Sequence, residues 1–159
     1  MSYDRLSDVV PNLQVKVVLG VMVFFLLGNV GVNTLHAEVS LEAIKQIESG
    51  GRADAIGDNG DSVGLYQISY ICLKEYNIYH IKAPISPAEL RSPESNRKVA
   101  EWYVGVRIPQ MLKARGHSVT IHHILIAYNC GISCLDRTSL PSTTIRYLAK
   151  YEQLTGEQL

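Results

Sequence analysis

Residues 118–129 read SVTIHHILIAYN, and this stretch decides the class of fold. Four apolar residues recur at helical spacing along one face: Ile121, Ile124, Leu125 and Tyr128. Ile126 and Ala127 make the opposite side apolar as well. A helix that is apolar nearly all round is buried in the centre of a domain. The sequence therefore predicts a central buried helix that ends at Asn129, where Gly131 stops it.

Shorter helices with recognisable start signals flank this central helix along the chain. Ser40 is placed to cap a helix that begins at Leu41, and the pair Gly50-Gly51 stops it. Residues 86–89 have the spacing of a capping box with proline at the first helical position, and a second Ser-Pro start follows. Further helices are expected over residues 69–78, 91–108 and 144–154.

The helix predicted over residues 91–108 has an apolar face. Four of its residues fall at i, i+3, i+4 and i+7 and are expected to face the core: Val99, Trp102, Tyr103 and Val106. Pro109 follows, and we expect it to kink or break the helix because proline lacks the backbone N–H that a helix needs; Gly116 then ends the helical stretch.

A small β element is predicted between the first two helices. Residues 55–68 read AIGDNGDSVGLYQI, in which Asn59-Gly60 is a strong hairpin signal. We expect two or three short strands here and no strong strand signal elsewhere. The predicted fold class is mainly α (α+β), with several short helices around a buried central helix plus a small β-hairpin.

Length and charge restrict the class of protein. The chain has 159 residues, enough for one compact domain with a core. Its 15 basic and 15 acidic residues balance, so no basic field argues for nucleic acid as a partner. We expect a monomer.

The N-terminal segment differs from the rest of the chain. Lys16 precedes an uninterrupted apolar run at residues 17–28, and Ala37 stands at a plausible cleavage site. We interpret residues 1–37 as a signal peptide, or as a membrane anchor through residues 17–32 if it is not cleaved. Either interpretation places residues 38–159 outside the cytoplasm, in the periplasm, the cell envelope or the medium.

Glu48 is the residue that suggests chemistry. It lies in the stretch IESGG, residues 47–51, in the last turn of the first predicted helix. The negative end of the helix dipole and the apolar neighbours Ile44 and Ile47 both disfavour ionisation of its carboxyl group. A carboxyl that stays protonated near neutral pH is suited to general acid catalysis. Taken alone, a solvated surface glutamate would explain this position equally well.

The sequence resembles the lysozyme-like lytic transglycosylases of the soluble (SLT) type, which are relatives of goose-type lysozyme. Three motifs carry the resemblance, in this order: ESGG at 48–51, GLYQI at 64–68 and AYNCG at 127–131. Tyr147 in the last predicted helix resembles the family's late tyrosine, with Tyr151 as the competing choice. The resemblance covers about residues 40–152.

The resemblance implies a lysozyme-like fold and cleavage of the β-1,4 bond between N-acetylmuramic acid and N-acetylglucosamine in peptidoglycan. Glu48 would be the single acid and base, and the product would be a 1,6-anhydro sugar. Two alternatives stay open. One is a hydrolytic muramidase that uses Glu48 with a second carboxylate from the hairpin, namely Asp54, Asp58 or Asp61. The other is a protein that binds peptidoglycan without cleaving it.

The resemblance also implies a set of substrate-binding residues: Ser49, Gln67, Tyr128, Asn129 and Tyr147. Each has a structural explanation as well, such as backbone solvation, loop support or core packing. The three cysteines, Cys72, Cys130 and Cys134, leave one without a partner within the chain; Cys130 and Cys134 are close enough to pair. The histidine and cysteine spacings match no standard zinc pattern, and we expect no metal and no cofactor.

Overall fold

The computed structural model of the chain describes residues 38–159. The predicted signal peptide or anchor in residues 1–37 therefore lies outside the described part. Within residues 38–159, no helix is both long and apolar enough to cross a membrane.

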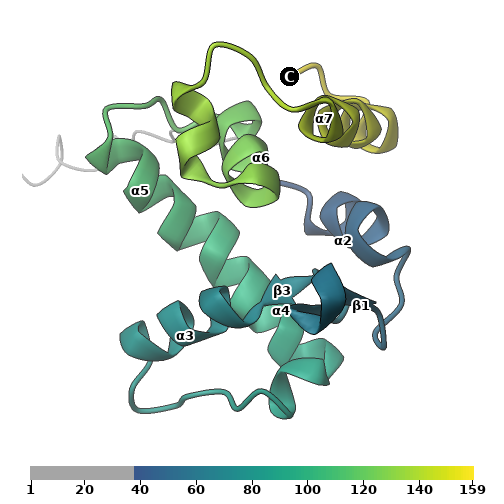
Figure 1. Cartoon of the computed structure of the whole chain (residues 1–159), viewed down its shortest axis with the longest axis vertical. Helices are drawn as coiled ribbons and strands as arrows, with labels where there is room; N and C mark the ends of the chain where they lie inside the picture. The colour runs from purple at the N-terminus through teal and green to yellow at the C-terminus, as the bar shows by residue number, and fades with distance from the viewer. Residues whose placement is uncertain (1–37) are drawn as a thin grey trace, which may run out of the picture. The chain divides into compact units, whose positions relative to one another are not determined.

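The described part is mostly helical (Figure 1). Its α-helices, in chain order, are α2 (Leu41–Ser49), α3 (Tyr70–Tyr79), α4 (Pro93–Trp102), α5 (Ile108–Ala114), α6 (Ile121–Cys130) and α7 (Ser142–Thr155). Short 3-10 turns occur at η1 (Asp58–Gly60), η2 (Glu89–Arg91) and η4 (Ile132–Asp136), and η3 (Tyr103–Arg107) is a π-helical turn. The predicted fold class is confirmed.

The predicted hairpin is the first half of a three-stranded antiparallel sheet in the order β1 (Ile56–Gly57), β2 (Ser62–Val63) and β3 (Ile68–Ser69). The turn between β1 and β2 is wider than Asn59-Gly60 alone and spans four residues. Asp58 and Asn59 both take left-handed backbone angles in it, with φ of 48° and 56°. Aspartate and asparagine tolerate that conformation better than other non-glycine residues.

Helix α6 is the buried helix that the sequence predicted. Its four residues 124–127 are buried, and the helix packs against α5, η4 and α7. Thr120 caps its start by accepting a hydrogen bond from the His123 N–H, and Gly131 ends it. Helix α2 packs in turn against α7, which brings the two ends of the described chain together.

The predicted caps are present. Ser40 and Ser92 accept hydrogen bonds from backbone N–H groups in the first turns of α2 and α4. Ser69 caps α3 in the same way, although the sequence analysis named no cap there. The Ser86–Glu89 capping box also forms, with reciprocal bonds of 2.8 and 3.2 Å between side chains and backbone N–H groups. It starts only the short turn η2, because the second Ser-Pro start follows at once.

The prediction for the core face of residues 91–108 was wrong at one position. Val99 is fully buried and Trp102 and Tyr103 are half-buried, but Val106 is 44% exposed and Val104 is buried instead. The π-helical turn η3 inserts an extra residue per turn, so residues after Tyr103 are rotated relative to an α-helix. Pro109 lies in the first turn of α5, directly after this π turn, and α4, η3 and α5 follow without a break.

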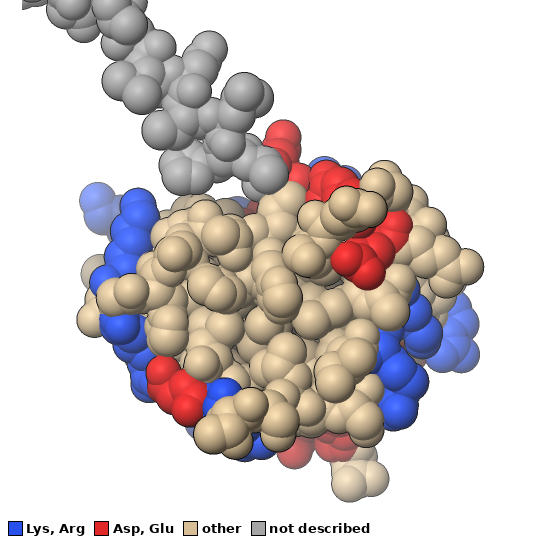
Figure 2. All heavy atoms as spheres, turned by 90° about the horizontal axis from the view of Figure 1, so that it is seen from above, with Lys and Arg blue, Asp and Glu red and all other residues tan. Residues whose placement is uncertain are grey.

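The surface seen from above the view of Figure 1 has a largely uncharged centre (Figure 2). Lysines and arginines lie at the left and right edges of this face; the largest group of acidic side chains lies at the upper right, and smaller ones lie at the lower left and lower edge. On the part that the picture shows, the basic side chains do not form one continuous field.

Candidate active site

Glu48 lies in the last turn of α2, and Gly50 ends the helix in the left-handed conformation, with φ of 63°. The Gly50 N–H bonds back to the Gln46 carbonyl, which closes the helix one residue after Ser49. Glycine allows this termination without steric cost. The chain then leads into the first strand of the sheet at Ile56.

Glu48 is partly buried, and its carboxyl group has an unusual pKa. Burial raises the pKa to about 7, because an ionised carboxylate loses hydration in this setting. The Tyr147 hydroxyl lowers the pKa, and the charge of Asp58 raises it. The net result is a carboxyl group that is half-protonated near neutral pH, as a group that first donates and then accepts a proton should be.

The Tyr147 hydroxyl is the neighbour of Glu48 that the sequence singled out. Tyr147 extends from α7 and is 5% exposed, and its oxygen is the one buried side-chain polar atom in residues 38–159 with no hydrogen-bond partner. It is close enough to Glu48 to lower that group's pKa, yet not at direct hydrogen-bond geometry. Catalytic hydrogen bonds are often long before substrate binds and tighten in the complex. The competing residue Tyr151 is occupied elsewhere, because its hydroxyl accepts the Ser40 N–H at 2.7 Å.

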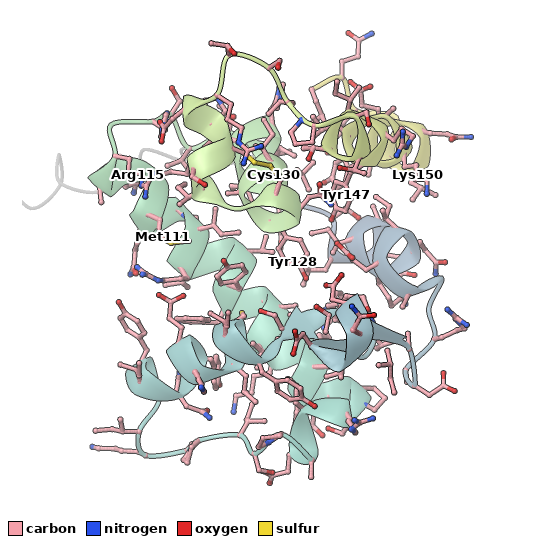
Figure 3. The ribbon with its side chains drawn as sticks, in the orientation of Figure 1. Met111, Arg115, Tyr128, Cys130, Tyr147 and Lys150 are labelled. Atoms are coloured by element: carbon pink, nitrogen blue, oxygen red, sulfur yellow. A yellow bond between two sulfur atoms is a disulfide. The ribbon has the colours of Figure 1, made fainter. Side chains whose placement is uncertain are left out.

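Two of the predicted residues donate hydrogen bonds to the loop at residues 64–67, which carries the second motif. The buried hydroxyl of Ser49 donates to the Leu65 carbonyl at 2.8 Å. The Tyr128 hydroxyl donates to the next carbonyl, that of Tyr66, at 2.6 Å. In Figure 3, Tyr128 on α6 and Tyr147 on α7 lie on the sides of their helices that face α2 and the sheet. The first and third motifs therefore meet at the second.

A third residue, which the sequence did not single out, also holds this loop through hydrogen bonds. Asn96 on α4 is fully buried; its Oδ1 accepts the Tyr66 N–H at 2.9 Å, and its Nδ2 donates to the carbonyls of Val63 and Leu90. Gly64 lies against this amide, and a Cβ on Gly64 would collide with it. The only signal in the sequence was an asparagine inside a helix, where asparagine is not favoured.

Gln67 supports the loop from within. Its Nε2 donates to the Gly64 carbonyl at 2.9 Å and to the Ala55 carbonyl at 3.3 Å, which ties the loop to the approach of β1. Its backbone has φ of 46°, a strained value for a residue with a side chain. Such strain is concentrated at functional sites, and here it lies two residues from the carbonyl that Ser49 binds.

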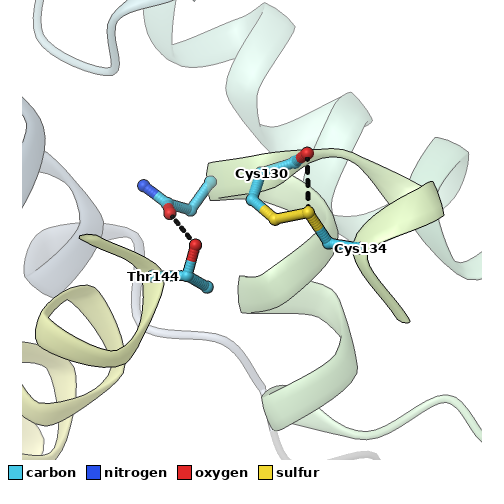
Figure 4. The surroundings of a disulfide bond; sticks show 4 residues. Cys130, Cys134 and Thr144 are labelled. Atoms are coloured by element: carbon cyan, nitrogen blue, oxygen red, sulfur yellow. Dashed lines mark hydrogen bonds between the residues drawn. A yellow bond between two sulfur atoms is a disulfide. The ribbon is translucent and has the colours of Figure 1, made fainter. Parts of the chain in front are cut away.

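Asn129 links the end of α6 to α7. Its Oδ1 accepts a hydrogen bond of 2.8 Å from the buried hydroxyl of Thr144, one turn before Tyr147 (Figure 4). Asn129 itself is exposed, and its Nδ2 donates no hydrogen bond within residues 38–159. Thr144 is a second residue, after Asn96, that contacts the predicted site residues and that the sequence gave no reason to select.

The cysteine pairing that the sequence left open is resolved. Cys130 and Cys134 form a disulfide that joins the end of α6 to η4, directly beside Asn129 (Figure 4). Cys72 is free and buried, and burial raises the pKa of its thiol to about 12. It is therefore not a reactive nucleophile at neutral pH.

Only one of the three hairpin aspartates acts on Glu48. Asp58 raises the pKa of Glu48 through its charge, whereas Asp54 and Asp61 are not among the groups that shift it. Asp58 is exposed, and its Oδ2 accepts the Ser62 hydroxyl at 2.7 Å. Within residues 38–159, no three histidine, cysteine or acidic side chains are grouped so that they could hold a metal ion.

Comparison with known proteins identifies the family. The family model described as the transglycosylase SLT domain matches residues 32–144. The chain belongs to the transglycosylase SLT domain family. This family acts on peptidoglycan, which agrees with a lysozyme-like arrangement in which one glutamate ends a helix beside a small sheet. Searches of curated proteins and of solved structures gave no match.

Proposed function

We propose that this SLT-domain chain is a lytic transglycosylase that cleaves the β-1,4 bond from N-acetylmuramic acid to N-acetylglucosamine. Glu48 is its single acid and base. The observation that carries the proposal is the pKa of about 7 that burial gives the Glu48 carboxyl. Since peptidoglycan lies outside the cytoplasm, the domain acts in the periplasm, the cell envelope or the medium.

The reaction needs one group that gives a proton and then takes one. Protonated Glu48 donates to the glycosidic oxygen, and the bond from that oxygen to the anomeric carbon of the muramic acid breaks. The Glu48 carboxylate then accepts the proton of the muramic C6 hydroxyl as its oxygen attacks the anomeric carbon. The products are a free 4-hydroxyl on N-acetylglucosamine and a 1,6-anhydro ring, and no water is consumed.

The surrounding residues support this cycle in distinct ways. Tyr147 positions the Glu48 carboxyl and donates to it when substrate draws the two groups together, which its unpartnered buried hydroxyl favours. Ser49 and Tyr128 hold the 64–67 loop and so fix the wall of the site, with Gln67 bracing the loop from inside. Asn129 donates through its Nδ2 to an N-acetyl carbonyl of the glycan, a role supported by the engagement of its Oδ1 alone by Thr144.

The runner-up function is hydrolysis with a second carboxylate. One observation favours it: the charge of Asp58 acts directly on Glu48. Glycosidases that use a nucleophilic or water-activating carboxylate place it ~5 to ~9.5 Å from the acid. Of the three hairpin aspartates, Asp58 is the one whose charge acts on Glu48, so it is the candidate for that second carboxylate. We rank it second because Asp58 is exposed and its Oδ2 is engaged by Ser62 in turn formation.

Digestion of purified peptidoglycan, followed by mass analysis of the released fragments, tests the proposal. We expect 1,6-anhydromuramic ends from the parent chain and none from Glu48→Gln. Glu42→Gln is the matched control, because Glu42 is an exposed glutamate on the same helix. Free reducing muramic ends would support hydrolysis through Asp58. Unchanged cleavage by Glu48→Gln, or binding of glycan without any cleavage by the parent chain, would refute the proposal.

A further inference from the structure

Exposed apolar side chains gather on one short segment. Of the eight large apolar residues that are exposed in residues 38–159, four lie between residues 71 and 81. They are Ile71 at 81% exposed, Ile78 at 71%, Tyr79 at 54% and Ile81 at 77%. Single exposed apolar residues need no explanation, but a cluster of them marks an interaction site.

Two of these residues, Ile71 and Ile78, lie on one stripe of α3. Ile71, Lys74 and Ile78 fall at i, i+3 and i+7 on α3, which is the stripe opposite its buried residues Cys72, Leu73 and Tyr76. Ile81 and Lys82 follow directly after the helix, and both are exposed. We call these five residues, Ile71, Lys74, Ile78, Ile81 and Lys82, the outer face of α3.

The opposite side of α3 is fixed, so the isoleucines cannot turn inward. Tyr76 is buried; its ring stacks on His80 at 3.9 Å between centroids and meets the ring of Trp102 edge-on at 5.3 Å. The Ser69 hydroxyl caps the start of the helix. Rotating α3 to bury Ile71 or Ile78 would expose this aromatic packing to water.

The outer face of α3 carries only positive charge. Lys74 and Lys82 are both exposed on it. The one acidic residue of α3, Glu75, is bonded through its Oε1 to the Arg107 guanidinium at 2.7 Å, and Arg107 also lies over the Tyr79 ring. The face therefore offers isoleucines and two ammonium groups with no unpaired carboxylate, and this combination is complementary to an anionic lipid surface.

We propose that the outer face of α3 binds the surface of an anionic membrane, with Ile71, Ile78 and Ile81 in the headgroup boundary and the two lysines among the lipid phosphates. Independently of α3, the apolar run at residues 17–28 would hold the chain at a membrane if it is retained as an anchor. Each lysine at such a surface is worth roughly fivefold in affinity, so the pair contributes roughly 25-fold. This surface carries no residue of the proposed active site.

A fluorescent reporter tests the proposal on the full chain. Ile78→Cys is labelled with an environment-sensitive dye and mixed with vesicles of phosphatidylglycerol and phosphatidylethanolamine, or of phosphatidylcholine alone. Ile145→Cys is the matched control, because Ile145 is an exposed isoleucine on α7. The parent chain sets the labelling background from the buried Cys72.

With anionic vesicles, we expect the fluorescence of the dye at position 78 to rise severalfold and its emission to shift to the blue. We expect little change for the dye at position 145, or at either position with phosphatidylcholine. Lys74→Glu together with Lys82→Glu should remove the rise but leave peptidoglycan cleavage unchanged, which separates this proposal from the enzymatic one. Equal signals at positions 78 and 145, or equal signals with both lipids, would overturn it. A rise at position 78 that follows protein concentration without vesicles would also overturn it and would assign the face to a second copy of the chain.

Discussion

Replacing Glu48 with glutamine should stabilise the fold while it removes activity, because the native environment of this carboxyl group disfavours its charge. The pKa of Glu48 is raised from an ordinary 4.5 to about 7. Between those two values the native state holds the proton more tightly than the unfolded chain does. The free energy of unfolding therefore falls as the pH rises from 4.5 to about 7, and it is constant above that range with respect to this group.

The magnitude follows from the same two pKa values. A rise from 4.5 to about 7 corresponds to about 3 kcal/mol at roughly 1.4 kcal/mol per pKa unit. Glutamine has nearly the same shape and no charge at any pH. Glu48→Gln should thus match the parent chain at pH 4.5 and exceed it by as much as ~3 kcal/mol at pH 8, or ~10 °C in Tm for a domain of this size.

Thermal and urea unfolding at pH 4.5, 6 and 8, followed by circular dichroism, measure this difference. Glu42→Gln serves as the control on the same helix. Glu42 is fully exposed, and its pKa is lowered by hydrogen bonds to Lys45 and Gln46, so its replacement should not stabilise the chain at any pH. A Glu48→Gln chain that is no more stable than the parent at pH 8, or whose advantage does not grow with pH, would refute the reasoning that burial holds this carboxyl group protonated.

Four further outcomes follow from the site. The value of kcat/KM should decline above pH 7 as Glu48 ionises, with no acidic limb from a second carboxylate if Glu48 acts alone. Tyr147→Phe should lower kcat and move this decline to higher pH, because the Tyr147 hydroxyl lowers the pKa of Glu48. Asp58→Asn should move the decline to lower pH while the products remain 1,6-anhydro sugars. Gly64→Ala should destabilise the fold by roughly 2 to 4 kcal/mol in thermal unfolding, because it combines a left-handed backbone with a collision against Asn96.

Matched control variants separate these effects from a general loss of stability or activity. Tyr151→Phe removes a hydroxyl from the same helix but should leave the pH profile unchanged, because that hydroxyl binds the Ser40 N–H. Gly116→Ala has the same kind of backbone, with φ of 77°, and open space around the new methyl group. Equal destabilisation at Gly64 and Gly116 would exclude the Asn96 contact as a cause, and an unshifted profile in Tyr147→Phe would remove Tyr147 from control of Glu48.

The sequence by itself indicated most of the elements and singled out Glu48 as the candidate acid. Helix starts at Ser40, Ser69 and Ser92 and helix ends at Gly50 and Gly131 are local signals, made by side chains and backbone within one turn. The burial of α6 followed from apolar residues on all its sides. Glu48 stood out because the position of a carboxyl group at a helix end is itself a local feature.

The tertiary structure alone decided how those parts meet. Which carbonyls Ser49 and Tyr128 bind, which tyrosine of α7 lies beside Glu48 and which aspartate acts on it all depend on contacts between residues distant in sequence. The selection of Asn96 depended on packing in the same way. The wrong prediction for Val106 has a different cause. The π turn changes the rotation between successive side chains, whereas a prediction from periodicity assumes that this rotation is constant. Local signals fix where an element begins and ends, and only packing fixes which of its side chains reach the site.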